Sequence, residues 1–77
     1  KMTNQAKYEA FISGIDNSVA GSDFYGNLAE HVACSAEGNA CDAADGINDP
    51  EGWYAVALGT AEMIVDDWTS FYPELIK

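Results

Sequence analysis

Apolar residues near the N-terminus recur at the spacing of one helical face. They follow the i, i+3, i+4, i+7 series of an amphipathic helix, and they are Tyr8, Phe11, Ile12, Ile15 and Val19. Thr3 is a suitable N-cap, and Gly14 with the polar cluster at 16–18 weakens the far end. The pattern predicts a first helix from about Thr3 to Asn17.

A second helix is predicted after a turn at 20–23. Ser22 is a suitable N-cap, and Asp23 places a negative charge in the first turn, where the helix dipole favours it. Gly38 is a typical C-terminal stop. We therefore expect residues 39–48 to form a loop that holds a short helical turn at 41–45. The apolar positions of this helix are Phe24 or Tyr25, Leu28, Val32 and Ala36.

The third helix has the strongest start signal in the chain. Asp49 is an N-cap residue, Pro50 suits the first helical position, and Glu51 adds an acid to the first turn. The helix should end near Tyr72, because Pro73 cannot continue it. Its apolar stripe consists of Tyr54, Ala57, Leu58, Ala61, Ile64, Val65 and Trp68.

These elements predict an all-α fold. No alternating run of β-branched residues is long enough to propose a sheet. We expect one domain, residues 1–77, forming a compact three-helix bundle with a loop between helices two and three and with the third helix at its centre. Phe71, Leu75 and Ile76 should fold back onto the bundle.

The chain carries thirteen Asp and Glu residues against three Lys and Arg, a formal charge of −10. Every acid lies between residues 8 and 76, where no Lys or Arg occurs. Burial of an unpaired carboxylate costs several kcal/mol, so we expect the acids on the surface. Direct binding to nucleic acid or to an anionic membrane requires positive charge and is therefore excluded. The charge favours a basic partner.

Negative charge is concentrated near the end of the third helix. Glu62 and Asp66 are an i, i+4 like-charge pair, and Asp66 and Asp67 approach the C-terminus, where the dipole favours cations. Violated local preferences are expected at functional sites. In the second helix, Asp23, Glu30 and Glu37 would share one face.

With its short length and acids on a helical frame, the chain resembles, as a class, the small acidic inhibitors of phages and mobile elements. These are anti-CRISPR and anti-restriction proteins that mimic nucleic acid. The resemblance implies a protein that docks on a basic, nucleic-acid-binding surface and competes with DNA or RNA. The acids that carry the resemblance are Glu30, Glu37, Asp42, Asp45, Asp49, Glu51, Glu62, Asp66 and Asp67.

A second apolar face of the third helix consists of Trp53, Val56, Thr60 and Met63. We expect a flanking segment to cover it. If it is open, Trp53 and Met63 become anchors of the partner-binding site, or the face mediates a homodimer. The alternative function is therefore a small helical adaptor that self-associates through this face, its acidity serving solubility or adaptation to salt.

Cys34 and Cys41 are too few for a disulfide framework, and on one helix they stand about 10 Å apart. We predict small buried thiols. The alternatives are a local disulfide, if the chain reverses at Gly38 and Asn39, and a metal site, which lacks a second ligand pair.

Residues 42–51 are rich in oxygen ligands but do not fit the calcium-loop pattern, so we expect an Asx-rich loop leading to a helix cap. His31 is the lone histidine and could pair with Cys34, but Glu30 is on the wrong face to orient it. We predict no enzyme activity, no cofactor and no metal. Lys1 before Met2 is typical of a residue added ahead of an initiator, and no secretory leader follows, so we expect a cytoplasmic protein.

Overall fold

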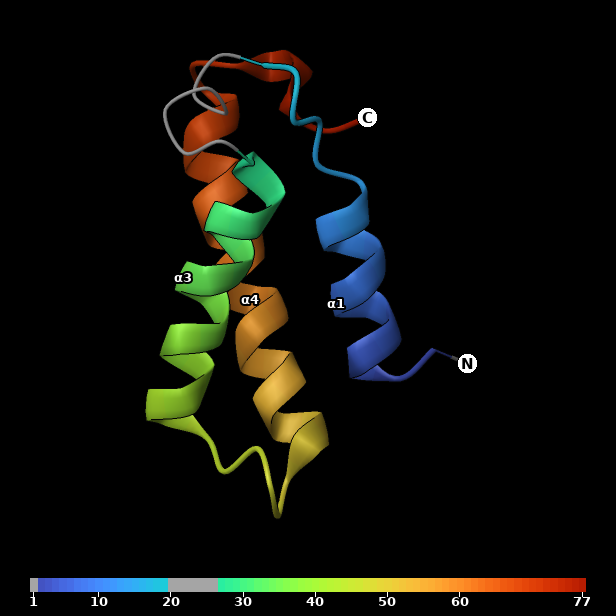
Figure 1. Cartoon of the computed structure of the whole chain (residues 1–77), viewed down its shortest axis with the longest axis vertical. Helices are drawn as coiled ribbons and strands as arrows, with labels where there is room; N and C mark the ends of the chain where they lie inside the picture. The colour runs from blue at the N-terminus through green and yellow to red at the C-terminus, as the bar shows by residue number, and fades with distance from the viewer. Residues whose placement is uncertain (1, 20–26) are drawn as a thin grey trace.

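The protein is an all-α three-helix bundle. The computed structural model describes residues 2–19 and 27–77. These residues form helices α1 (Asn4–Ser13), α3 (Leu28–Ala43) and α4 (Pro50–Thr69) and a single 3₁₀ turn, η1 (Pro73–Leu75), as Figure 1 shows. The predicted fold class is confirmed.

Helix α1 begins as predicted and ends four residues early. The Thr3 hydroxyl accepts a hydrogen bond from the Ala6 N–H at 3.1 Å and so caps the helix. The chain leaves the helix at Gly14, and the Asp16 carboxylate then holds the N–H and hydroxyl of Ser18 in a turn. Ile15 is still buried, although it is no longer helical. The predicted boundary at residue 17 was wrong because an apolar residue past the helix end can reach the same core.

Helix α3 begins at the Asn27 cap, whose side-chain oxygen accepts the Glu30 N–H at 2.8 Å. The predicted cap and first turn, Ser22 and Asp23, lie outside the described residues. The predicted stop at Gly38 was wrong, because the helix continues to Ala43 and leaves only residues 44–49 as the loop. A glycine costs a helix about 1 kcal/mol, and the packing of Ala40, which is fully buried, offsets that cost.

Helix α4 has the predicted start. The Asp49 carboxylate accepts the Gly52 N–H at 3.0 Å, and Pro50 occupies the first helical position. The helix ends at Thr69, three residues before the predicted end. The hydroxyls of Thr69 and Ser70 donate to the backbone carbonyl oxygens of Asp66 and Asp67, respectively. These bonds provide partners for carbonyl groups in the last turn, where intrahelical N–H donors run out.

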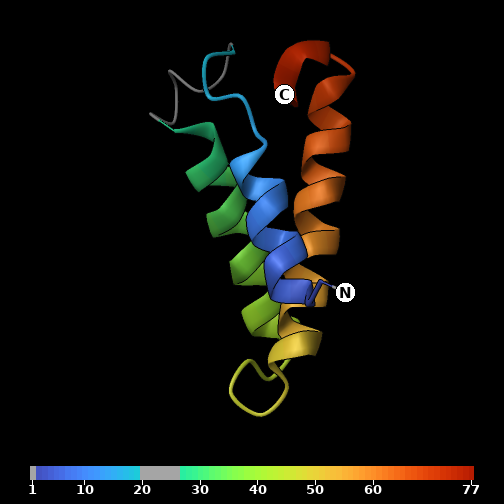
Figure 2. The ribbon, with the colours of Figure 1, turned by 90° about the vertical axis from the view of Figure 1, so that its right-hand side faces the viewer.

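The core lies where α4 meets the other two helices. Helix α4 packs against both α3 and α1, whereas α1 and α3 meet over a smaller area, so α4 is the central element as predicted. Figure 2, in which α1 faces the viewer, shows α1 lying over the seam between α3 and α4. Alanines on α3 and α4 let these two helices approach closely. The helical core residues are Tyr8, Leu28, Val32, Ala36, Ala40, Ala57, Ala61 and Val65.

The C-terminal segment returns to the bundle through Leu75, which is fully buried as predicted. The Asp16 N–H donates to the Leu75 carbonyl at 2.7 Å, and Ile15 and Ile76 form an isolated antiparallel bridge. Ile76 is exposed, because successive residues of an extended segment face opposite sides. Phe71 is 80% exposed, so the prediction that it folds back was wrong: it follows the end of α4 and faces solvent.

Among the described residues, no helix is long and apolar enough to span a bilayer.

Candidate acidic binding surfaces

The acidic residues gather on two of the three helices. We call residues 28–69, which comprise α3, the loop and α4, the acidic hairpin. It contains nine of the thirteen acids and no Lys or Arg. Lys7 lies on α1, and Lys77 follows η1 and helps to lower the pKa of Asp16, after the larger effect of the Ser18 hydrogen bonds. The hairpin surface therefore presents negative charge without intervening cations from its own side chains.

Some of the predicted partner-binding acids have local structural roles. Asp45 accepts the Asn48 side-chain amide at 2.6 Å and the backbone N–H groups of Asn48 and Ile47, both at 3.1 Å. These bonds stabilise the charged form and lower the pKa of Asp45. Asp49 is the α4 cap. The expected Asx-rich loop leading to a helix cap is confirmed, and no group of His, Cys, Asp or Glu suited to a metal occurs within the described ranges.

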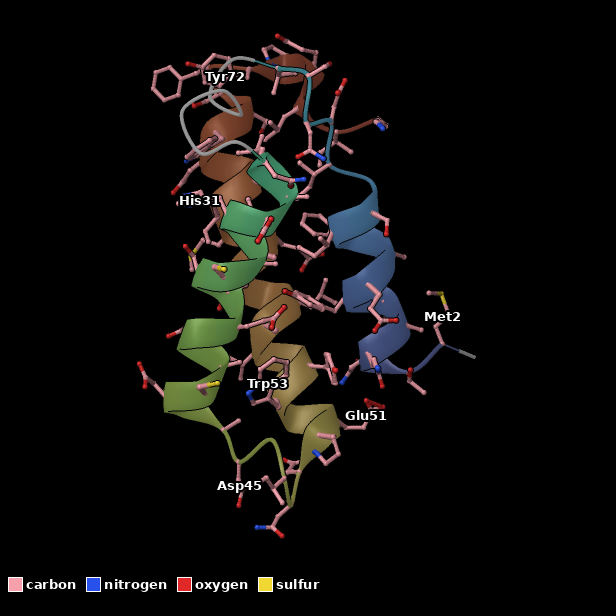
Figure 3. The ribbon with its side chains drawn as sticks, in the orientation of Figure 1. Met2, His31, Asp45, Glu51, Trp53 and Tyr72 are labelled. Atoms are coloured by element: carbon pink, nitrogen blue, oxygen red, sulfur yellow. The ribbon has the colours of Figure 1, made fainter. Side chains whose placement is uncertain are left out.

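Glu51 joins the start of α4 to the start of α1. Its carboxylate accepts the Asn4 backbone N–H at 3.1 Å, and its carbonyl oxygen accepts the Asn4 side-chain amide at 3.0 Å. Figure 3 places Glu51 and Asp45 at the loop end of the bundle. Of the predicted partner-binding acids, Asp45, Asp49 and Glu51 thus hold this end together, and their second function in binding stays a prediction.

Five other hairpin acids are exposed, and their carboxylates accept no hydrogen bond from the part of the chain that the structure describes. They are Glu30, Asp42, Glu62, Asp66 and Asp67. Glu62 and Asp66 lie one turn apart on α4, with Met63 beside them at 61% exposure. Glu62, Met63, Asp66 and Asp67, which we call the α4 acidic patch, are therefore available to a partner without loss of an internal hydrogen bond.

The second apolar face of α4 is largely covered, as expected. The loop passes over Trp53, so that a Cβ added at Gly46 would lie 2.9 Å from the indole Cδ1. Thr60 accepts the Asn39 side-chain amide at 2.8 Å and donates to the Val56 carbonyl. Within this face Met63 is largely exposed and Trp53, Val56 and Thr60 are half-buried, so a homodimer through α4 stays a prediction.

A pocket of about 300 Å³ lies where α1, α3 and the start of α4 meet. It brings together two of the predicted site residues, Glu37 and Trp53, which are sixteen positions apart in the sequence. Figure 3 shows the Trp53 side chain in the space between α3 and α1. We call this the α1–α3 pocket. Its lining residues are Tyr8, Glu9, Ile12, Ser13, Ala33, Glu37, Trp53 and Tyr54.

Tyr8 is the main residue of this pocket that sequence reasoning did not place among the candidate site residues. The residue is 4% exposed, its ring centroid lies 5.9 Å from that of Tyr54, and its hydroxyl donates to Glu37 Oε2 at 2.7 Å. Burial, and then the Glu37 carboxylate, raise the pKa of Tyr8. The apolar periodicity assigned Tyr8 to the core, which is correct for its ring, but gave no signal for the carboxylate on another helix.

The cysteines differ from the prediction. Cys34 and Cys41 are both exposed free thiols, not buried ones. Because α3 continues through Gly38, the two residues stay on one helix about 10 Å apart, so the local disulfide that needed a reversal at Gly38 does not form.

The His31 ring packs against the Trp68 ring, with centroids 6.0 Å apart.

Comparison of the chain with protein-family models, with curated proteins and with solved structures gave no match.

Proposed function

We propose that this protein is an acidic binding protein that docks on a basic, nucleic-acid-binding surface of a partner protein. It inhibits that partner by competing with DNA or RNA, in the manner of anti-CRISPR and anti-restriction inhibitors. The supporting observation is the composition of the acidic hairpin, which has nine carboxylates and no Lys or Arg.

The distribution of hydrogen bonds supports the same proposal. Carboxylates with local partners stabilise the fold, whereas those of the α4 acidic patch accept no hydrogen bond from the described residues and repel one another in the free protein. A basic partner would remove that repulsion. Attraction to a basic groove depends on summed charge and less on register, so a helical row with about 6 Å of rise between acids is sufficient to compete with phosphates.

The proposal can be tested by competition. A short labelled DNA duplex is bound to a basic DNA-binding domain, and the protein is added while the anisotropy of the duplex is followed. We expect displacement at low salt and a steep loss of displacement as salt rises, because the attraction between exposed charges is screened. No displacement at low salt from any of a panel of such domains would refute the proposal.

A charge-reversed variant tests the surface. Glu62, Asp66 and Asp67 are replaced together by Lys, which changes the formal charge by +6 and leaves the core untouched. We expect displacement to be abolished while the far-UV circular dichroism spectrum is kept. The matched control replaces the same residues by Gln, Asn and Asn, and should displace with intermediate strength. If the Lys variant displaces the duplex as well as the original protein does, the acidic patch is not the docking surface.

A further inference from the structure

The α1–α3 pocket combines three aromatic rings with two carboxylates. Tyr8, Trp53 and Tyr54 contribute the rings, and the ring centroids of Trp53 and Tyr54 lie 4.9 Å apart at an interplanar angle of 81°. Glu9 and Glu37 contribute the carboxylates. Aromatic faces and carboxylates both attract cations, and an anionic ligand would be repelled by both.

Glu37 is held in place before any ligand arrives. Its Oε2 accepts the Tyr8 hydroxyl at 2.7 Å, and within the described residues its Oε1 accepts no hydrogen bond. The Tyr8 ring is fixed in turn by burial in the core. A carboxylate positioned in this way loses little side-chain entropy on binding, and its second oxygen is free to accept hydrogen bonds from an incoming donor.

Glu9 stands on the α1 side of the pocket. It is exposed, and its Oε2 accepts the Gln5 side-chain amide at 3.2 Å, one helical turn away. The two carboxylates thus come from different helices, and the same lining includes aromatic rings from α1 and α4. Among the residues that the structure describes, no lysine or arginine lines the pocket, so none of them supplies a cation to balance these charges there.

We propose that the α1–α3 pocket receives the side chain of an arginine from the basic partner. A guanidinium is planar, stacks on aromatic faces, and presents several N–H donors in a fixed fork that can reach two carboxylates. An ammonium is a compact, strongly hydrated point charge and uses flat aromatic walls less well. A volume of about 300 Å³ is sufficient for one such side chain and is small for a larger ligand.

The source of the arginine rests on the proposed function, whereas the chemistry of the pocket does not. The pocket includes Glu37 and Trp53 of the acidic hairpin but none of the α4 acidic patch. The two proposals can therefore fail separately, and separate variants test them.

The probe is N-acetyl-arginine amide, and its isosteric neutral counterpart is the citrulline derivative. Binding is followed by two-dimensional ¹H–¹⁵N NMR of the intact protein, including the indole N–H of Trp53. We expect saturable shifts in the millimolar range for the arginine probe, centred on Trp53, Glu37 and neighbouring amides. We expect no saturable shifts with the citrulline probe and at least about fivefold weaker binding of the lysine analogue. Equal binding of the arginine and citrulline probes, or shifts spread evenly over the acidic hairpin, would overturn the proposal. Equal binding of the arginine and lysine probes would overturn the inference that the pocket prefers a guanidinium to an ammonium.

Glu37→Gln removes one of the two negative charges of the pocket while keeping an oxygen that can accept the Tyr8 hydroxyl. We expect it to weaken arginine binding about tenfold, the effect of losing one charge-assisted hydrogen bond. Glu62→Gln is the matched control, since it makes the same charge change on an exposed part of α4 outside the pocket. It should change arginine binding by no more than about twofold, because exposed charges farther away than a Debye length are screened. If the two variants weaken arginine binding equally, only the overall charge of the protein matters, and the proposal that the α1–α3 pocket binds arginine is overturned. The Lys variant of the α4 acidic patch supports both proposals if it no longer competes with the duplex but still binds the arginine probe. If it keeps both activities, only the assignment of the α4 acidic patch as the docking surface is refuted.

Discussion

Replacement by alanine is predicted to change the free energy of unfolding in opposite directions at three glycines of the acidic hairpin. Gly38 in α3 and Gly59 in α4 are exposed, and a Cβ added at either would meet no atom within 4 Å. A Cβ at Gly46 would lie 2.9 Å from Cδ1 and 3.2 Å from Cγ of Trp53. None of the three has a backbone φ in the left-handed region, so the methyl group alone decides the outcome.

The magnitudes follow from these surroundings. Gly38→Ala and Gly59→Ala should each raise the free energy of unfolding by about 0.5–1 kcal/mol, because alanine reduces the backbone entropy lost on helix formation. For a domain of this size that is a rise in Tm of about 2–8 °C. Gly46→Ala forces the indole to move and should lower the free energy of unfolding by about 1–2 kcal/mol, after the smaller entropic gain is subtracted.

Urea unfolding followed by far-UV circular dichroism measures all three variants. We expect the midpoints to move and the m-values to stay constant, since the surface exposed on unfolding hardly changes. Near-UV dichroism of Gly46→Ala should also change, because the environment of Trp53 changes. A neutral or stabilising Gly46→Ala would show that the loop does not pack on Trp53, and a destabilising Gly59→Ala would show that the outer face of α4 is not open.

Two further predictions concern charge and pH. Asp66→Lys replaces the repulsion from Glu62 by an attractive i, i+4 pair and places a cation near the helix C-terminus, where the dipole favours it, so the free energy of unfolding should rise by about 0.5–1.5 kcal/mol at low salt. Thermal unfolding should show that this gain becomes smaller as sodium chloride is added. A gain independent of salt would contradict its electrostatic origin. The pKa of Tyr8 is raised in the folded protein, so its contribution to stability is complete below the ordinary tyrosine pKa of about 10 and is lost as pH rises above it. Tyr8→Phe removes the hydrogen bond to Glu37 and should lower stability by about 1–2 kcal/mol at neutral pH, but its stability should fall less steeply than that of the original protein in alkaline urea titrations. An identical alkaline slope in both proteins would refute this assignment.

Local sequence signals predicted the helices and most of their first residues. Thr3 and Asp49 cap the helices that their side chains predict, because capping depends only on atoms three residues away. The surface position of the described acids was also predictable, since three basic residues cannot neutralise thirteen acids in any fold. These features depend on short-range geometry or on composition, and both can be read from the chain directly.

Tertiary packing decided the remaining features. Helix α3 continues past Gly38 because Ala40 packs in the core, and this same continuation leaves Cys34 and Cys41 exposed and apart. The α1–α3 pocket needs Glu37 beside Tyr8, which is twenty-nine residues away, and no periodicity specifies such a pair. Helical spacing determines which residues share a face of one helix. Which faces meet is determined by the packing of whole helices, and the pocket exists only where three of those faces meet.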